Sequence, residues 1–130
     1  MVKGKTRLLI VEDEIVTLMV FKKFFSTNEI TVDTAETLEE ALDCINRKNY
    51  AVILADLRLT GVIGQEGLEI LKAVRKKKLK TQVIIITGYG TPEIKKEAFA
   101  LGASHFFEKP VSPYTLLAAM DIGLNGVPNE

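Results

Sequence analysis

Short apolar runs alternate along the chain with longer stretches in which apolar residues recur every three or four positions. The runs predict strands, because a short and continuous apolar segment suits a strand that is buried on both faces. The longer stretches predict amphipathic helices. We expect strands at Arg7–Val11, Ile30–Thr34, Ala51–Ala55, Gln82–Thr87 and Ser104–Glu108, and helices near 14–26, 37–48, 66–78, 92–101 and 113–124. The repeated strand-then-helix order predicts an α/β domain with a parallel sheet covered on both faces.

Capping residues support several of these helix boundaries. Glu40 follows Thr37 at the spacing of a capping box, which favours a helix start at that point. Pro92 follows Thr91 and fits the first helical position. Gly102 directly follows the predicted fourth helix, where a glycine is typical of a helix end.

Composition limits the classes of protein to which the chain can belong. Its 130 residues are 47% hydrophobic, which suits a single domain over 1–130, with a core from about 5 to 124 and no output domain. The net charge is zero, so no overall basic field predicts nucleic-acid binding. No apolar run is long enough to predict a membrane span. The single cysteine excludes an internal disulfide and fits a reducing compartment, so we expect a cytoplasmic location.

Acidic residues follow two of the predicted strands. Glu12 and Asp13 come after the first strand, and Asp56 ends the third. Ligands of such sheets bind beyond the carboxyl ends of the strands, so we expect these three side chains to converge. Crowded carboxylates repel one another unless a cation lies between them. An oxygen-only site with few protein ligands suits Mg²⁺, with Mn²⁺ as an alternative.

Two further residues at the same edge of the sheet predict phosphoryl chemistry. Lys109 follows the fifth strand and supplies a positive charge that can hold a phosphate. Thr87 ends the fourth strand and supplies a hydroxyl donor. A lysine, a hydroxyl and a metal around one carboxylate form a phosphoryl-transfer site, in which Asp56 is the nucleophile that becomes an aspartyl phosphate.

The stretches "LLIVEDE", "VILADLRLTG", "VIIITGYGT" and "GASHFFEKPV" resemble the receiver domain of two-component response regulators, over nearly the whole chain. The likeness is to the single-domain kind found in chemotaxis and phosphorelays. It implies that Asp56 is phosphorylated and that Thr87 and Lys109 bind the phosphoryl group. It also implies a metal site formed by Glu12, Asp13, Asp56 and the backbone carbonyl of Arg58.

The resemblance also implies a fold and a way of signalling. The expected fold is a flavodoxin-like (βα)5 three-layer sandwich with strand order 2-1-3-4-5. Thr87 and Phe106 become the switch residues, and the bond before Pro110 becomes cis. The phosphate donor would be a sensor histidine kinase or a histidine phosphotransfer protein. The chain would be a signalling phosphoprotein that catalyses its own phosphorylation and aspartyl-phosphate hydrolysis, not a conventional enzyme, and would signal to a downstream protein as a monomer or weak dimer.

The first predicted helix is apolar on two faces. One stripe contains Thr17, Val20, Phe21 and Phe24, and the other contains Ile15, Leu18, Met19 and Lys22. A single stripe can face the sheet, so the other is expected to be exposed for docking. The charge of Lys22 places the second stripe outside. In receivers, this helix docks against the helical bundle that carries the phosphohistidine.

Three other interpretations compete with a phosphorylated receiver. A pseudo-receiver would serve as a phosphorylation-independent interaction module, although the five residues of the site chemistry are present. A haloacid dehalogenase-type phosphatase would need an acid where Arg58 stands. A nucleotide- or flavin-binding domain would need a glycine-rich loop after the first strand, and "VEDE" stands there instead.

Overall fold

The computed structural model describes residues 6–56, 66–77, 80–88 and 90–120. Strands and helices alternate along the chain, as predicted. The strands are β1 (Thr6–Val11), β2 (Ile30–Ala35), β3 (Val52–Asp56), β4 (Gln82–Thr87) and β5 (His105–Glu108). The helices are α1 (Ile15–Phe25), α2 (Leu38–Arg47), α3 (Glu66–Lys76), α4 (Pro92–Ala100) and α5 (Pro113–Ala119).

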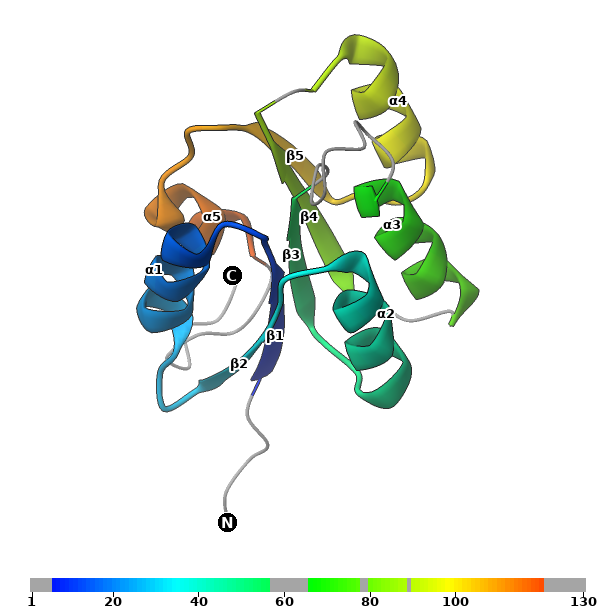
Figure 1. Ribbon diagram of the computed structural model, residues 1–130. Helices are drawn as coiled ribbons and strands as arrows, with labels where there is room; N and C mark the ends of the chain where they lie inside the picture. Colours follow the sequence, from blue (N-terminus) through cyan, green and yellow to red (C-terminus); the bar gives the residue numbers. More distant parts are fainter. Residues whose placement is uncertain (1–5, 57–65, 78–79, 89, 121–130) are drawn as a thin grey trace.

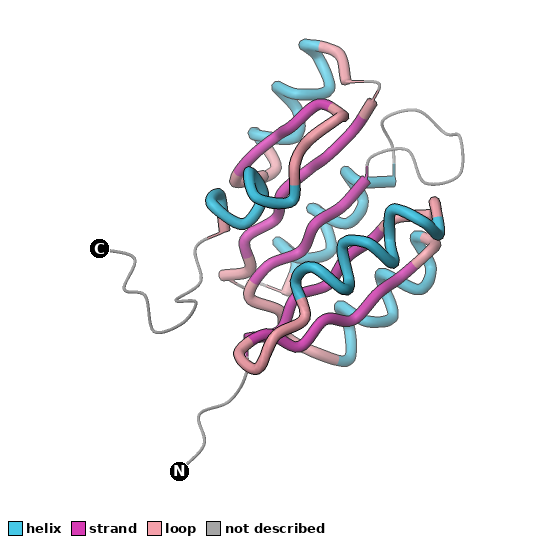
Figure 2. The backbone as a smooth tube through the Cα atoms, turned by 90° about the vertical axis from the view of Figure 1, so that its left-hand side faces the viewer, coloured by secondary structure: helices cyan, strands magenta, loops and turns pink. Residues whose placement is uncertain are grey.

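The strands form one parallel sheet in the order β2-β1-β3-β4-β5. Figure 1 shows α1 and α5 on one face of the sheet and α2, α3 and α4 on the other. The tube view in Figure 2 shows the same layers from the side. The expected flavodoxin-like three-layer sandwich and its strand order are therefore confirmed.

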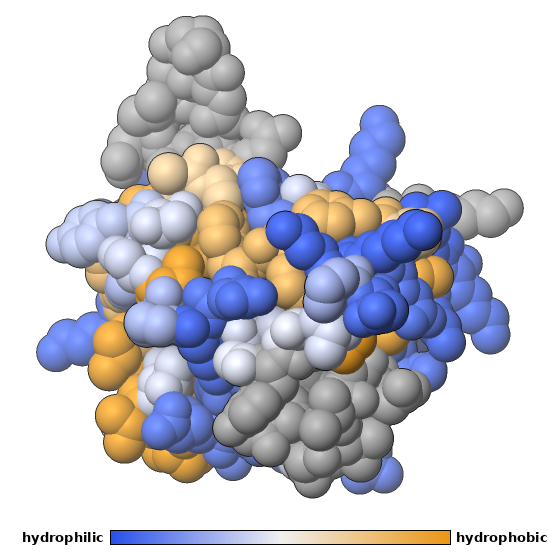
Figure 3. All heavy atoms as spheres, turned by 90° about the horizontal axis from the view of Figure 1, so that it is seen from above, coloured by the Kyte–Doolittle hydropathy of each residue, from blue (hydrophilic) through white to orange (hydrophobic). Residues whose placement is uncertain are grey.

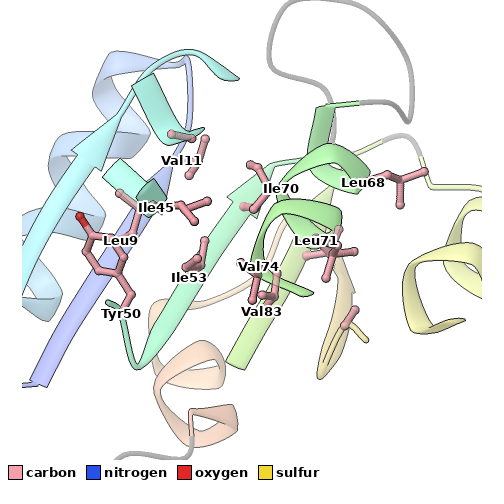
Figure 4. Packing of buried hydrophobic residues seen from close by; sticks show 14 of the residues in the cluster. Leu9, Val11, Ile45, Tyr50, Ile53, Leu68, Ile70, Leu71, Val74 and Val83 are labelled. Atoms are coloured by element: carbon pink, nitrogen blue, oxygen red, sulfur yellow. The ribbon is translucent and has the colours of Figure 1, made fainter. Parts of the chain in front are cut away.

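Alternate residues of each central strand point to opposite faces and build two separate cores. Leu9, Ile53 and Val83 belong to the core under α2, α3 and α4. Figure 4 shows Leu9, Ile53 and Val83 of the strands together with Ile70 and Leu71 of α3 in this core. The neighbouring residues of the same strands belong to the core under α1 and α5: Leu8, Ile10, Val52, Leu54, Ile84 and Ile86. Burial on both faces explains why the strands appear in the sequence as continuous apolar runs.

Side-chain caps fix the starts of three helices. The hydroxyl of Thr37 accepts the Glu40 N–H at 3.1 Å, and that of Thr91 accepts the Ile94 N–H at 3.1 Å. The Glu40 carboxylate accepts the N–H of Glu36 at 2.8 Å, one residue before the position that an ideal capping box would use. Ser112 caps α5 in the same way through the Tyr114 N–H.

Helix α5 is shorter than the sequence predicts. It ends at Ala119, because Met120 has an extended backbone with φ −76° and ψ 134°. The remainder of the predicted 113–124 segment, from residue 121, lies outside the described residues. Within the described part of the chain, none of the helices is long and apolar enough to cross a membrane.

The predicted orientation of α1 is wrong at Leu18. Its side chain is buried, with 5% of its surface exposed, whereas Val20 is 53% exposed. The helix turns the stripe Leu18, Phe21 and Phe25 toward the sheet, at the spacing i, i+3, i+7. The charge of Lys22 misled the prediction, since a long cationic side chain reaches solvent from the edge of a buried stripe.

We predict that Leu18→Ala and Val20→Ala differ strongly in their effect on stability. Loss of the buried Leu18 side chain is expected to lower the free energy of unfolding by about 2–5 kcal/mol. Loss of the exposed Val20 side chain is expected to change it by less than about 0.5 kcal/mol. Urea unfolding followed by circular dichroism measures both, and equal effects would contradict this orientation of α1.

Candidate functional site

The three predicted acids lie together at the carboxyl ends of β1 and β3. Parallel pairing sets Val11 beside Ala55, so the residues that follow them share one edge of the sheet. One carboxylate oxygen from each of Glu12, Asp13 and Asp56 lies within 4.8 Å of the others. Glu12 and Asp56 are buried, and Asp13 is exposed. Figure 3 views this end of the molecule, where hydrophilic atoms lie beside hydrophobic ones.

Lys109 reaches these acids from the end of β5. Its Nζ donates to Oδ2 of Asp56 at 2.8 Å and to Oε1 of Glu12 at 3.3 Å. Its backbone N–H donates to the carbonyl of Thr87 at 2.8 Å, which ties the lysine to the end of β4. The peptide bond between Lys109 and Pro110 is cis, as the resemblance implied. One ammonium group therefore contacts two buried carboxylates.

Glu12 is held at both of its carboxylate oxygens. Oε1 accepts from Lys109, and Oε2 accepts the backbone N–H of Glu14 at 3.1 Å, at the start of α1. The Glu14 carboxylate is itself hydrogen-bonded to the hydroxyl of Thr17 in the first turn of the helix. The acidic residue after β1 thus fixes the connection into α1 as well as facing Asp56.

The site shifts the pKa values of Glu12 and Lys109 upward. Burial, and then the negative charge of Asp56, raise the pKa of Glu12 from 4.5 to about 7, against the opposing effect of Lys109. Burial opposes the charge of Lys109, but its hydrogen bond with Asp56 and the charges of Asp56 and Glu12 outweigh that effect and raise its pKa. The lysine therefore remains charged, while Glu12 is close to half-protonated at neutral pH.

Thr87 ends β4 with its side chain buried. It stands one residue beyond Ile86, which pairs with Asp56 across the sheet. The next residue, Gly88, has open space where a side chain would be. Thr87 is therefore on the strand adjacent to Asp56 and at the same edge of the sheet. Arg58, the expected source of a backbone carbonyl, lies outside the described residues.

Phe106 lies on β5, on the same face of the sheet as α4. Its half-buried ring packs against the core under α2, α3 and α4. The ring centroid lies 6.5 Å from that of Phe99 in α4, with the planes tilted by 45°. The predicted switch residue thus lies between the edge of the sheet and a partly exposed helix.

The exposed apolar surface of α1 differs from the predicted docking patch. Ile15, Met19 and Lys22 are exposed as expected, but Leu18 is buried. Val16 and Val20, which the prediction left out of the patch, are 69% and 53% exposed. They form an apolar pair at i, i+4 on one helix face, a pattern that does not distinguish an exposed face from one that packs on the sheet.

A cavity of about 540 Å³ lies between α1 and the segment that follows β5. Helix α1 contributes Val16, Val20 and Phe21 to its wall. Lys109 and Pro110 line it from the other side. This cavity could not be predicted from the sequence, because its walls come from separate elements. It places the apolar surface of α1 directly beside the lysine that binds Asp56.

Comparisons with known proteins agree with this geometry. The family model described as "Response regulator receiver domain" matches residues 8–121. A CheY-like response regulator receiver domain protein of Methanospirillum hungatei JF-1 superposes with a TM-score of 0.80 and 30% identity, covering 88% of this chain and 90% of that one. The chemotaxis response regulator CheY4 of Vibrio cholerae superposes with a TM-score of 0.75 and 29% sequence identity. The match covers 88% of this chain and 95% of CheY4.

Curated relatives are longer than this chain. The transcriptional regulatory protein ResD of Bacillus subtilis is 29% identical over 110 residues, which are 85% of this chain and 44% of that protein. The cell cycle transcriptional regulator CtrA of Caulobacter vibrioides is 28% identical over 112 residues, which are 86% of this chain and 47% of CtrA. The chain therefore spans somewhat less than half the length of these relatives.

We predict that Glu12 makes the metal-free protein less stable as pH rises. The folded state retains a proton on Glu12 up to about pH 7, whereas the unfolded chain loses it near 4.5. Between these values the folded state binds more protons, so this contribution to the free energy of unfolding falls with rising pH. Its size is a few kcal/mol, since one pKa unit corresponds to about 1.4 kcal/mol.

Urea midpoints measured in EDTA across this pH range test the prediction. Glu12→Gln is expected to flatten the pH dependence, because its amide does not titrate. Glu97→Gln, which changes an exposed acid of α4, is expected to leave the slope intact. A slope that Glu12→Gln leaves unchanged would show that Glu12 titrates alike in both states.

Proposed function

The chain belongs to the response regulator receiver domain family, and from that membership we propose that Asp56 accepts a phosphoryl group and passes a signal to a partner protein. The donor is a phosphohistidine on a sensor histidine kinase or on a histidine phosphotransfer protein. The observation that carries the proposal is the 2.8 Å ion pair between Lys109 and a buried Asp56 beside two further acids.

Transfer requires an ionised carboxylate that can attack phosphorus. An oxygen of Asp56 forms the new P–O bond while the P–N bond of the phosphohistidine breaks. The electron pair of that bond returns to the imidazole nitrogen, which takes up a proton from water. Lys109 then keeps its ammonium beside the phosphoryl oxygens, and the Thr87 hydroxyl donates to another of them.

The carboxylates of Glu12, Asp13 and Asp56 fit a hard cation, because all three offer oxygen ligands within a small space. We propose Mg²⁺ at this position, with Mn²⁺ as an alternative and the backbone carbonyl of Arg58 as a further ligand. When bound, the ion offsets the negative charge that accumulates on the phosphoryl oxygens during transfer. Glu12 must release its proton before its oxygens bind the ion.

The phosphorylated state resets by hydrolysis. Water attacks phosphorus, the bond to the Asp56 oxygen breaks, the carboxylate is regenerated and inorganic phosphate is released. The protein supplies the same lysine, hydroxyl and carboxylates for phosphorylation and for hydrolysis. In this sense the chain is a signalling phosphoprotein that catalyses its own phosphorylation and dephosphorylation.

We place the docking of the donor on α1. Its exposed residues Ile15, Val16, Met19 and Val20 form an apolar surface, with Lys22 at its edge. The cavity continues this surface to Lys109, so a donor helix lying there would bring its phosphohistidine toward Asp56. Such a partner would be cytoplasmic and would act on a monomer or weak dimer. The proposal includes no contact with nucleic acid and no membrane insertion.

A downstream protein or an output domain responds to the phosphorylated state, because the longer relatives share somewhat less than half their length with this chain. No observation favours the alternative of a pseudo-receiver that serves only as an interaction module. Lys109 forms ion pairs with both Glu12 and Asp56, which a module without phosphoryl chemistry would not require.

We predict that acetyl phosphate with Mg²⁺ adds one phosphoryl group to the protein. Intact mass spectrometry is expected to show the gain, which disappears in EDTA and in Asp56→Asn. Lys109→Gln is expected to slow the gain about a hundredfold, because it removes a charged donor from the phosphoryl oxygens. Asp43→Asn, an exposed acid of α2, serves as the matched control.

A parent protein that neither gains the group nor binds beryllofluoride, a mimic of the acyl phosphate, would contradict phosphorylation at Asp56. Beryllofluoride binding without the gain would instead mean that the site is competent and accepts its phosphoryl group only from a protein donor.

We also predict that Mg²⁺ raises the urea midpoint. A ligand at a hundredfold excess over its Kd stabilises the folded state by about 2.7 kcal/mol. Asp13→Asn is expected to abolish most of this gain while Asp43→Asn retains it. Equal gains in both variants would place the binding outside the acidic cluster.

A further inference from the structure

Helix α1 carries most of the exposed apolar surface of the described residues. Six large hydrophobic side chains are exposed in that part of the chain, and four of them belong to this helix: Ile15, Val16, Met19 and Val20. Met19 is exposed over 63% of its surface. Figure 1 shows α1 beside α5 on one face of the sheet. A contiguous apolar patch of this kind is typical of a surface that another protein covers.

The two ends of α1 carry opposite charges. Asp13 and Glu14 are exposed immediately before the helix, and Lys22 and Lys23 are exposed in its last turn. Within the described residues, the ion pairs involve none of these four side chains. Glu14 and Lys23 lie about 13 Å apart along the helix axis, at 1.5 Å per residue. The helix therefore presents an acidic end, an apolar middle and a basic end to its surroundings.

This order of charges is complementary to itself in one arrangement. Two copies of α1 that pack antiparallel about a twofold axis near Met19 set Glu14 of each copy beside Lys23 of the other. The apolar residues between the charged ends then pack against the same residues of the second copy. A parallel pair would set acid against acid and lysine against lysine, which disfavours it. The charges therefore favour a second copy of this chain, in antiparallel orientation, as the protein that covers the patch.

We propose that α1 pairs with α1 of a second copy in antiparallel orientation, through its apolar middle and its oppositely charged ends. The contact uses the same surface on both copies, so the pair is closed and adds no third copy. The same residues form the surface on which the proposed function places the phosphohistidine donor, so a copy within the pair has no room for a donor on α1. That consequence rests on the proposed function, whereas the pairing does not.

Sedimentation of the unphosphorylated protein over a series of concentrations tests the pairing. We expect a monomer–dimer equilibrium that Val20→Asp weakens by about tenfold or more, because the new charge would be buried in the apolar middle. Phe99→Asp is the matched control, because Phe99 is also exposed but lies on α4. The proposal is overturned by a protein that remains monomeric at about 1 mM. It is also overturned by a dimer that Phe99→Asp disrupts and Val20→Asp does not.

Reversal of charge tests the role of the helix ends. Glu14→Lys and Lys23→Glu are each expected to weaken pairing, because two copies of either variant face each other with like charges. A mixture of the two variants is expected to pair again, since both ends of a mixed pair join opposite charges. A mixture that associates no better than either variant alone would contradict the proposed arrangement.

Disulfide cross-linking tests the direction of the pair and does not depend on the folding of Val20→Asp. In a Cys44→Ser background, the introduced cysteine is the only thiol of the chain. Oxidation with copper phenanthroline is expected to link Met19→Cys to itself and to link Ile15→Cys to Lys23→Cys in a mixture, because the twofold axis brings these positions within reach of a disulfide.

Asp43→Cys, an exposed position on α2, gives the background rate of random collision in the cross-linking experiment. Mass spectrometry of the linked peptides identifies the joined positions. Ile15→Cys that links to itself faster than to Lys23→Cys would show a parallel pair and overturn the proposal, as would a Met19→Cys rate equal to that of Asp43→Cys.

Failure of the pairing and failure of the proposed function give different results. A dimer that forms through α1 while the protein neither gains a phosphoryl group from acetyl phosphate nor binds beryllofluoride retains the pairing and removes the proposed function. A protein that gains the phosphoryl group but is monomeric at every concentration retains the proposed function and removes the pairing. The apolar surface of α1 would then serve the donor alone.

Discussion

The contact of Lys109 with two buried carboxylates is the interaction on which the site depends. Asp56 and Glu12 repel each other, and leaving a buried charge without a partner is costly. The lysine ammonium lies 2.8 Å from one and 3.3 Å from the other, so a single cation offsets both. The compensation is incomplete, which is visible in the pKa of Glu12 at about 7. Lys109 holds the site together, but a further positive charge would still stabilise it.

The sheet is what makes this contact achievable between residues far apart in the chain. Parallel strands bring every carboxyl end to one edge, so Glu12, Asp56 and Lys109 meet although they follow three different strands. The backbone N–H of Lys109 donates to the Thr87 carbonyl and fixes the position of the lysine backbone at the end of β4. The central strands are packed on both faces by the two cores. This packing holds the strand ends in place against the repulsion between Glu12 and Asp56.

The fold could be predicted from the sequence because its signals are local and repeated. Buried strands produce continuous apolar runs, and caps such as Thr37 mark helix starts. The grouping of Glu12, Asp56 and Lys109 followed from strand ends alone. The orientation of α1 could not be predicted, since Leu18 and Val20 are both apolar and packing on the sheet decides between them. The cavity beside Lys109 arises between separate elements, which no local pattern encodes.

The raised pKa of Glu12 also connects stability with function. A carboxylate that is half-protonated near pH 7 carries a proton that a cation must displace, so metal binding at this edge should strengthen as pH rises toward that value. A proton on Glu12 and the proposed metal ion would each stabilise the same crowded arrangement. The free-energy cost of bringing three acids together is therefore small when either the proton or the metal ion is bound. Because the shift comes first from burial and then from Asp56, phosphorylation of Asp56, which adds negative charge there, would itself change how tightly Glu12 holds its proton.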